Sequence, residues 1–268
     1  MNGELRALGR ALVRTRLSGL ILVVALLALW EASVAWRWVE SDSWPAFSAV
    51  LASFWRGLAD GELVNAIWSS LWRMVRGYAA GCALGIGLGV VLGTWLPARR
   101  ALQPPIEFIR PIPTPAIVPP LMFLLGVDDG LKIFVVAFAV FFPVLVSTMA
   151  GVSSVDVVYR QVARTFGVSP LATLWRVVLP ASLSHILAGM RISLALAIIV
   201  TIVVELISGS QGIGYYVISM QFASRAADMY AAIVLLTLVG YALNRAFVAF
   251  EARILHWSRL RETMGVET

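Results

Sequence analysis

Long apolar runs separated by short polar segments make up most of this chain. A helix needs about 20 mainly apolar residues to cross the hydrocarbon core of a bilayer. Runs of this length recur along the sequence, and one of them is interrupted by prolines. The pattern predicts about six membrane-spanning helices. We expect them at Leu17–Val39, Leu63–Leu96, Gln103–Gly126, Leu131–Ala150, Ile186–Ile207 and Met229–Phe250.

The composition agrees with a membrane protein built of helices. Of the 268 residues, 60% are hydrophobic, and the mean hydropathy is +0.86, whereas soluble domains are about 45–50% apolar. We predict an all-α polytopic membrane protein with a cytoplasmic segment at 1–16, a transmembrane domain at 17–250 and a cytoplasmic tail at 251–268. The first run is long and lacks an Ala-x-Ala cleavage site, so we expect a retained span and not a signal peptide.

Arginines indicate how the spans are oriented. The predicted inner segments hold Arg6, Arg10, Arg14, Arg16, Arg99, Arg100, Arg160, Arg164, Arg176, Arg253, Arg259 and Arg261. The clear outer segments hold only Arg56 and Arg225. Because short cytoplasmic loops are enriched in Lys and Arg, this bias places both termini on the cytoplasmic side of the membrane.

The stretch Val155–Pro180, between the fourth and fifth runs, is more polar and predicts two short helices joined by a turn. Its first helix has an apolar stripe of Val155, Val158, Val162 and Phe166, opposite Asp156, Arg160, Gln161 and Arg164. Gly167 suits a left-handed position after a helix, and Ser169 with Pro170 suits the start of the next one. We expect the second helix to end before Pro180. An amphipathic pair between two spans predicts a docking surface for a soluble partner.

Two predicted spans have unusual compositions. In the second, glycines recur every four residues, which predicts close packing against other transmembrane helices and a right-handed crossing. These are Gly77, Gly81, Gly85, Gly89 and Gly93. The third contains prolines at 104, 105, 111, 113, 115, 119 and 120. These prolines must break or kink the helix, and the carbonyl groups that lose their partners need protein or water around them.

The sequence excludes or disfavours several kinds of catalytic site. The only lysine, Lys132, follows Leu131, so there is no Gly-Lys-Ser/Thr phosphate-binding loop, and any ATPase must be another polypeptide. Cys82 is alone, which excludes a disulfide framework and a cysteine-based metal site. His185 and His256 have no Asp, Glu or His at metal-ligand spacing. We predict no catalytic residue, no metal, no cofactor and no binding of nucleic acid.

The stretch at 155–180 also resembles the cytoplasmic signature of ABC importer permeases. That signature is Glu-Ala-Ala, three residues, Gly, nine residues and Ile-x-Leu-Pro. Here it reads Gln161-Val162-Ala163, then Gly167, then Val177, Leu179 and Pro180. The spacing from Gly to Leu-Pro matches, whereas Gln161 and Val162 replace the first two letters.

Further motifs resemble one subgroup of these permeases, which serves nitrate, sulfonate, taurine and the pyrimidine precursor of thiamine. The motifs are Ser70-Leu71-Trp72-Arg73 with Gly77, Arg110-Pro111-Ile112-Pro113, Phe141-Phe142-Pro143, Ala150-Gly151-Val152 and Gly212-Ile213-Gly214. The resemblance implies the type I importer fold in the lipid of a bacterial inner membrane. It also implies separate ATPase subunits, an extracytoplasmic solute-binding protein and a second permease copy, usually identical.

The resemblance suggests two roles for particular residues. Within a cytoplasmic coupling loop at about 151–185, the residues expected to engage the ATPase are Arg160, Gln161, Ala163, Arg164, Phe166, Gly167, Ser169, Pro170, Leu179 and Pro180. Those expected to line or support the pathway are Arg110, Pro111, Pro113 and Glu205. Arg110 suits both attraction of an anion and support of the broken span. The subgroup favours a small solute that is anionic, sulfonate- or nitrate-like, or a pyrimidine.

Two other functions compete with the importer. An ion-coupled secondary transporter would need acidic residues inside the membrane, and Glu31 and Glu205 are the candidates. Internal repeats would favour such a transporter, and none is evident between the halves. Glu31 is also explained by pairing with another helix. A membrane-embedded enzyme would need catalytic partners for His185 or His256. Co-purification with an ATPase separates the importer from both.

Overall fold

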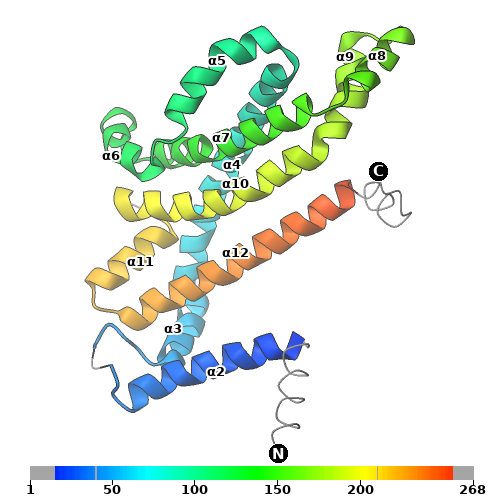
Figure 1. Ribbon diagram of the computed structural model, residues 1–268. Helices are drawn as coiled ribbons and strands as arrows, with labels where there is room; N and C mark the ends of the chain where they lie inside the picture. Colours follow the sequence, from blue (N-terminus) through cyan, green and yellow to red (C-terminus); the bar gives the residue numbers. More distant parts are fainter. Residues whose placement is uncertain (1–15, 40, 210, 256–268) are drawn as a thin grey trace, which may run out of the picture. The chain divides into compact units, whose positions relative to one another are not determined.

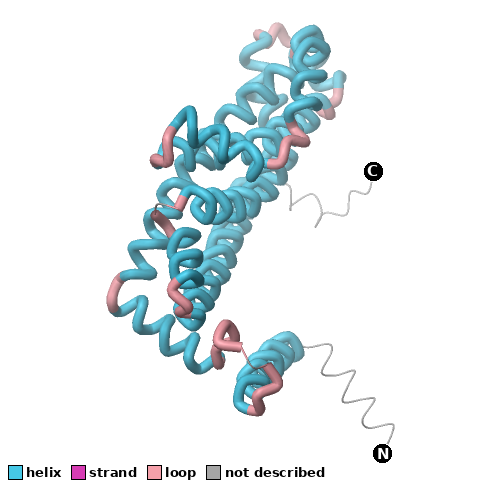
Figure 2. The backbone as a smooth tube through the Cα atoms, turned by 90° about the vertical axis from the view of Figure 1, so that its left-hand side faces the viewer, coloured by secondary structure: helices cyan, strands magenta, loops and turns pink. Residues whose placement is uncertain are grey.

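The computed structural model describes residues 16–39, 41–209 and 211–255 (Figure 1). Every regular element in these ranges is a helix (Figure 2). The chain divides into two compact units. The first unit comprises residues up to Val64 together with Val217–Leu235, and the second comprises Asn65–Tyr216 together with residues from Leu236 onward.

In the first unit, α2 (Arg16–Ala35) and α3 (Phe47–Ala59) are joined by a segment rich in aromatic residues. The Trp30 ring lies 5.2 Å from that of Trp44 and 5.6 Å from that of Phe47, between centroids. The Trp30 indole also donates to the Pro45 carbonyl at 3.0 Å. The polar N–H group of Trp30 thus has a hydrogen-bond acceptor, and the apolar faces of its ring pack against other rings. These contacts fix the connection between α2 and α3.

The second unit is built around α7 (Asp129–Ser153), which packs against α4 (Glu62–Thr94) along the glycine stripe. A Cβ on Gly81 would lie 2.6 Å from the Ala137 carbonyl oxygen, and one on Gly89 would lie 2.6 Å from the Thr148 Cβ. The α7 side chains facing the five glycines are Val136, Val140, Val144, Thr148 and Val152. The contact positions on both helices therefore repeat every four residues. The close packing predicted from the stripe is confirmed, and its partner is α7.

The other side of α7 packs against α10 (Leu179–Ser208). A Cβ on Gly151 would lie 2.6 Å from the Cβ of His185, and one on Gly189 would lie 2.5 Å from that of Ser147. His185 is thus a packing residue of α10. The buried side chains at the centre of this layer include Val135, Val140, Val144, Leu187, Ala197 and Val204.

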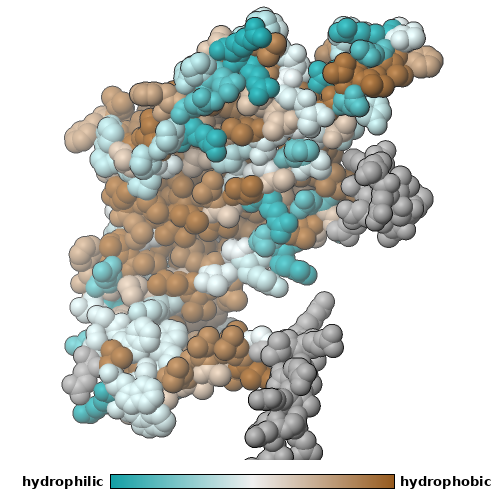
Figure 3. Space-filling model, viewed as in Figure 1, coloured by the Kyte–Doolittle hydropathy of each residue, from teal (hydrophilic) through white to brown (hydrophobic). Residues whose placement is uncertain are grey.

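The remaining helices follow the same order as the predicted spans. They are α5 (Leu96–Ile109), α6 (Thr114–Leu125), α8 (Val157–Thr165), α9 (Pro170–Thr173), the π-helical turn η1 (Leu174–Val178), α11 (Ile213–Phe222) and α12 (Ala226–Ile254). From their charge, Arg99 and Arg100 were expected in a short turn between the second and third spans; this is wrong, because both residues lie inside α5. On the face shown in Figure 3, hydrophilic residues gather over α5, hydrophilic and hydrophobic residues are mixed at α8 and α9, and hydrophobic residues cover most of α10.

Four helical runs of the described residues are long and apolar enough to cross a membrane. They are Glu62–Thr94, Asp129–Ser153, Pro170–Ser208 and Ala226–Ile254. The α5–α6 pair is a fifth candidate if a bent pair counts as one span, and the apolar part of α2, Ile21–Ala35, is a shorter helix. The all-helical polytopic architecture predicted from the sequence is therefore confirmed.

Candidate functional site

The predicted pair of short helices after α7 is present as α8 and α9, and each begins with a side-chain cap. The Asp156 carboxylate accepts from the Val158 amide at 2.9 Å, and the Ser169 hydroxyl accepts from the Ala172 amide at 3.3 Å. Such caps satisfy amide groups that have no partner inside the helix. Ser169 followed by Pro170 therefore starts α9 as predicted.

Gly167 forms the turn between α8 and α9. Its φ is +68°, in the left-handed region that glycine adopts without steric cost. The Val168 amide donates to the Ala163 carbonyl, and the Gly167 amide donates to the Arg164 carbonyl, both at 2.9 Å. This pair of bonds is a Schellman motif, which ends a helix at a left-handed residue. A Cβ on Gly167 would meet nothing within 4 Å in this chain.

Most of α8 is exposed, including its apolar stripe. Val158, Val162 and Phe166 are exposed, and Phe166 keeps 80% of its accessible surface. Only Val155, just before the helix, is buried. The opposite side of α8 packs against the rest of the chain. There Ala163 is buried, and Arg160 donates to the Val152 carbonyl at 2.7 Å. The exposed stripe is the apolar surface that the amphipathic pattern predicted.

The other residues expected in the coupling loop lie as follows. Gln161, Arg164, Phe166, Gly167, Ser169, Pro170 and Pro180 are exposed, and Leu179 is partly buried. Leu171 and Trp175 add two large exposed side chains that the sequence analysis did not single out. The loop thus presents a mixed apolar and basic surface at the end of α7 and α10 opposite α6 (Figure 1).

The predicted helix end before Pro180 is wrong. Helix continues from α9 through η1 into α10 as one run, Pro170–Ser208. Proline lacks an amide and crowds the carbonyl four residues earlier. The π turn accommodates this, because the Leu179 amide donates five residues back, to Leu174. The fifth span therefore begins inside the loop that was predicted to couple to an ATPase.

The predicted break in the third span is confirmed. The axes of α5 and α6 differ by 92° across Arg110–Pro113. Arg110, Pro111 and Pro113 are all exposed in the single chain. Pro113 precedes α6 in an extended conformation, as expected for a residue next to the start of a helix. Backbone of this kind at membrane depth is tolerated only against protein or water.

A hollow of about 100 Å³ with both polar and apolar walls lies next to this break, between α5 and α7. It is lined by Gln103, Ile106, Glu107 and Arg110 of α5 and by Leu145, Val146 and Met149 of α7. The Gln103 amide donates to the Glu107 carboxylate at 2.7 Å. Arg110 lines this hollow, a position that suits both roles considered for it, attraction of an anion and support of the broken span.

Glu205, near the end of α10, is the centre of a buried network that the sequence analysis did not assemble. Its carboxylate accepts from the Ser70 hydroxyl at 2.7 and 2.8 Å, from the Arg73 guanidinium at 3.2 Å and from the Gly214 amide at 3.0 Å. Arg73 also pairs with Asp129 at 2.5 Å. Glu205 and Lys132 keep 0% and 1% of their accessible surface. The network joins α4, α7 and α10.

The turn between α10 and α11 is bound to the same network. The Gln211 carbonyl accepts from Arg73 at 3.3 Å and from Lys132 at 3.1 Å. Gly212 has a φ of +111°, and a Cβ there would overlap the Glu205 carboxyl group. The Gly-x-Gly stretch is therefore explained by a backbone that folds directly onto Glu205. A sequence signal existed, since Arg73, Lys132 and Glu205 each lie near the outer end of a predicted span.

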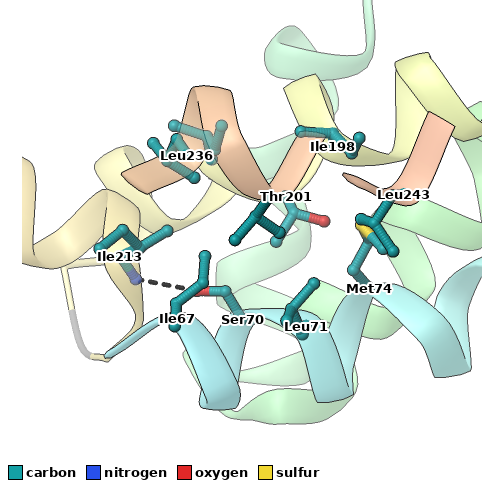
Figure 4. Close-up of a pocket in the computed structure, with 11 residues that line it drawn as sticks. Ile67, Ser70, Leu71, Met74, Ile198, Thr201, Ile213, Leu236 and Leu243 are labelled. Atoms are coloured by element: carbon teal, nitrogen blue, oxygen red, sulfur yellow. Dashed lines mark hydrogen bonds between the residues drawn. The ribbon is translucent and has the colours of Figure 1, made fainter. Parts of the chain in front are cut away.

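A small apolar pocket adjoins this network on the side of Ser70 (Figure 4). At the edge of the pocket, the Ser70 hydroxyl accepts from the Ile213 amide at 2.8 Å. Its walls include Ile67, Leu71, Met74, Ile198, Thr201 and Leu243. The space of about 20 Å³ holds about one water molecule. It is too small for a transported solute.

Glu31, the other acid considered for an ion-coupled transporter, has a structural partner in the first unit. Its carboxylate accepts from the Ser48 amide at 3.0 Å and from the Ser48 hydroxyl at 2.7 Å. An acid at the N-terminus of a helix, here α3, is favoured by the unpaired amides. This supports the pairing interpretation. Among the residues that the structure describes, no group of three or more His, Cys, Asp or Glu side chains could hold a metal ion. His256 lies outside the described residues.

Residues 81–256 match the family described as "Binding-protein-dependent transport system inner membrane component". This match covers more than half of the chain. The chain belongs to this family. It is therefore an ABC importer permease of the inner membrane, as the sequence motifs predicted.

The named relatives of this permease include proteins named for the transport of aliphatic sulfonates and of nitrate. The "Putative aliphatic sulfonates transport permease protein SsuC" of Escherichia coli (strain K12) is 32% identical over 243 residues, which are 91% of this chain and 92% of SsuC. The nitrate import permease protein NrtB of Leptolyngbya laminosa is 28% identical over 248 residues, covering 90% and 88% of the two chains. The permease thus belongs with the sulfonate, taurine and nitrate type.

A solved structure supports the fold of this permease. The inward-facing MetNI methionine ABC transporter matches 72% of this chain and 95% of its own, with a TM-score of 0.61 and 17% sequence identity. At this identity the likeness speaks for the fold alone. The type I importer fold predicted from the sequence is confirmed.

Proposed function

We propose that this permease forms the translocation pathway for a small sulfonate or related organic anion and couples import to separate ATPase subunits through α8 and α9. The observation that carries the coupling role is the exposed loop surface of Val158, Val162, Phe166, Leu171 and Trp175. Large apolar side chains on a cytoplasmic loop favour burial against a protein partner. The neighbouring arginines Arg164 and Arg176 suit an acidic rim on that partner.

The partners follow from the same proposal. The chain has no phosphate-binding loop of its own, so hydrolysis takes place on ATPase subunits below the membrane. The family is binding-protein-dependent, so an extracytoplasmic protein delivers the solute. Two copies of this permease enclose the pathway, and the exposed break at Arg110–Pro113 faces that pathway. An open helix break then borders water, which satisfies its free carbonyl groups.

Import of an anion gives Arg110 a direct role. Arg110 is exposed and lines the hollow between α5 and α7, and a guanidinium binds sulfonate oxygens by charge-assisted hydrogen bonds. Charged residues within membrane spans face water-filled cavities because burial in lipid is costly. We propose that Arg110 is the cation that attracts the solute as it passes the break.

Replacing this cation tests the solute class. Arg110→Gln should reduce uptake of a radiolabelled alkanesulfonate about tenfold, since a hydrogen bond to a charged group contributes about 1.5 kcal/mol or more. The KM should rise more than the maximal rate falls, and Arg110→Lys should retain most of the uptake. The assay uses vesicles with the ATPase subunits and the loaded binding protein. Arg100→Gln, also on α5 but away from the hollow, is the matched control. Unchanged uptake in Arg110→Gln would contradict the proposed role.

Both termini are proposed to lie in the cytoplasm, on the same side as α8 and α9. Cysteines introduced as Glu262→Cys and Asp60→Cys test this in a Cys82→Ser background. Cys82 is buried in α4, and its loss should be mild. An impermeant thiol reagent should label position 262 only from the cytoplasmic side and position 60 only from outside. Labelling of position 262 from outside would overturn this orientation.

A further inference from the structure

The buried network around Glu205 fixes one particular piece of backbone, the turn Gln211–Gly214. The Ile213 and Gly214 amides donate to Ser70 and Glu205, and the Gln211 carbonyl accepts from Arg73 and Lys132. The side chain of Gln211 also accepts from Arg73 at 3.2 Å. Three residues of the turn, Gln211, Ile213 and Gly214, are therefore bound to side chains of α4, α7 and α10.

The same network lies at one end of the run that carries the coupling loop at its other end. Pro170–Ser208 is a single helical run of 39 residues, roughly 58 Å of helix at 1.5 Å per residue. It begins directly after the Gly167 turn and ends three residues after Glu205. α7 repeats this arrangement, with Lys132 in the network and Val152 bound to Arg160 of α8.

We propose that Arg73, Lys132 and Glu205 act as a clamp that makes the turn Gln211–Gly214 move with α10. When α8 and α9 are displaced, α10 would then transmit the movement to the opposite side of the membrane, where the binding protein releases its solute. This inference rests on the proposed function, because it assumes that ATPase subunits move the loop. Arg73, Lys132 and Glu205 are positioning residues in this role, and they need not touch the solute.

The chemistry of the clamp suits a rigid connection. A buried ion pair that loses one partner leaves an uncompensated charge, which is strongly unfavourable. Intermediate arrangements, with the turn half released, are therefore disfavoured, and a fully satisfied network holds one geometry. Gly212 adds to this because its backbone lies against the Glu205 carboxyl group with no room for a side chain. Turn and helix end are held as one piece.

Glycine variants separate the clamp from its surroundings. In Gly212→Ala the new methyl group would enter the Glu205 carboxyl group, so the turn must leave the network. Gly130→Ala adds the same methyl group two residues from Lys132, where nothing lies within 4 Å. Gly209→Ala adds left-handed strain to the same connection, at φ +62°, without any contact within 4 Å. Glu205→Gln is the independent variant, because it removes the charge and keeps the side-chain volume.

The experiment measures four properties of the complete transporter in vesicles: amide hydrogen exchange at residues 211–216, ATPase co-purification, ATP hydrolysis with and without loaded binding protein, and uptake. In Gly212→Ala and Glu205→Gln we expect exchange at 211–216 to accelerate roughly tenfold and uptake to fall by a similar factor. The ATPase subunits should still co-purify and hydrolyse ATP, but the loaded binding protein should no longer stimulate them. Gly130→Ala should match the wild type, and Gly209→Ala should retain most of the uptake.

Three results would overturn the clamp. The first is normal uptake despite accelerated exchange, which would show that the turn need not move with α10. The second is unchanged exchange in both variants, which would show that the network does not hold the turn. The third is loss of both variant proteins from the membrane, which would make the network a folding element only. Failure of the proposed function is distinct, since the wild type and Gly130→Ala would then also lack ATP-driven uptake.

Discussion

Gly81→Leu is expected to remove most of the folded protein from the membrane. A Cβ at this position lies 2.6 Å from the Ala137 carbonyl oxygen and 2.9 Å from Val140. The carbonyl belongs to the α7 backbone and cannot rotate away, so the two helices must separate. Separation at one glycine loosens the contacts at Gly77 and Gly85 as well. Overpacking a core costs about 1–3 kcal/mol, and we expect this variant at or above the upper end.

A matched variant lies on the same helix. Gly87→Leu adds the same side chain to α4 at an exposed position, where a Cβ meets nothing within 4 Å. The measurements are abundance in the membrane and the midpoint of thermal aggregation in detergent. Gly87→Leu should resemble the wild type in both, whereas Gly81→Leu should be depleted and aggregate at a lower temperature. Equal behaviour of the two variants would show that the α4–α7 contact does not stabilise the fold.

Gly167→Asp is expected to abolish most ATP-driven uptake while the protein remains in the membrane. Its left-handed conformation costs a residue with a side chain about 1 kcal/mol, and the space around it is open in this chain. The folded permease should therefore tolerate the change. The proposed ATPase surface would meet a new charged side chain at the turn between α8 and α9, so its assembly with the permease should weaken.

Two further variants separate the causes of that loss. Gly167→Ala adds the left-handed strain without the charge and should retain more uptake than Gly167→Asp. Gln161→Glu adds a charge to the exposed face of α8 without strain, and it should be tolerated. Membrane abundance, ATPase co-purification and uptake are measured together. If Gly167→Asp assembles and transports like the wild type, α8 and α9 are not the coupling surface.

The elements whose structure depends on local pattern were predictable from the sequence. The glycine repeat of α4 identified a close helix contact, because glycine at every fourth residue of a span lets another helix backbone approach closely. Ser169, Pro170 and Gly167 identified the turn and the start of α9, because caps act within a few residues. Prolines predicted that the third span is broken, although the sequence did not say at which of them. In each case the physical cause lies close to the residue in the sequence.

The errors arose where one local rule competed with another. Proline ends most helices, yet Pro180 lies within a helical run because η1 re-registers the hydrogen bonds before it. Arg99 and Arg100 suited a cytoplasmic turn by charge, yet they continue into helix because Pro97 occupies a position at the start of α5 where an amide is not needed. Charge and proline content alone do not distinguish a loop from the first turn of a helix.

The network around Glu205 shows what a single sequence leaves out. Ser70 and Glu205 are separated by 135 positions, and Arg73 and Gln211 by 138, so no periodicity links them. The network also bears on the secondary-transporter alternative. A proton or cation site needs an acid that can exchange its ligand, whereas Glu205 accepts from Ser70, Arg73 and Gly214 and Glu31 accepts from Ser48. Both acids thus have structural partners.

The central claim is that this permease transports its solute only when ATPase subunits drive it. The most direct measurement is uptake of a labelled alkanesulfonate by vesicles that contain the permease, with the loaded binding protein outside and ATP inside, with and without the ATPase subunits. The expected result is uptake only when the ATPase subunits are present, and no effect of a protonophore on that uptake. Uptake that continues without the ATPase subunits and collapses with the proton gradient would contradict the claim and make Glu31 and Glu205 the residues to test.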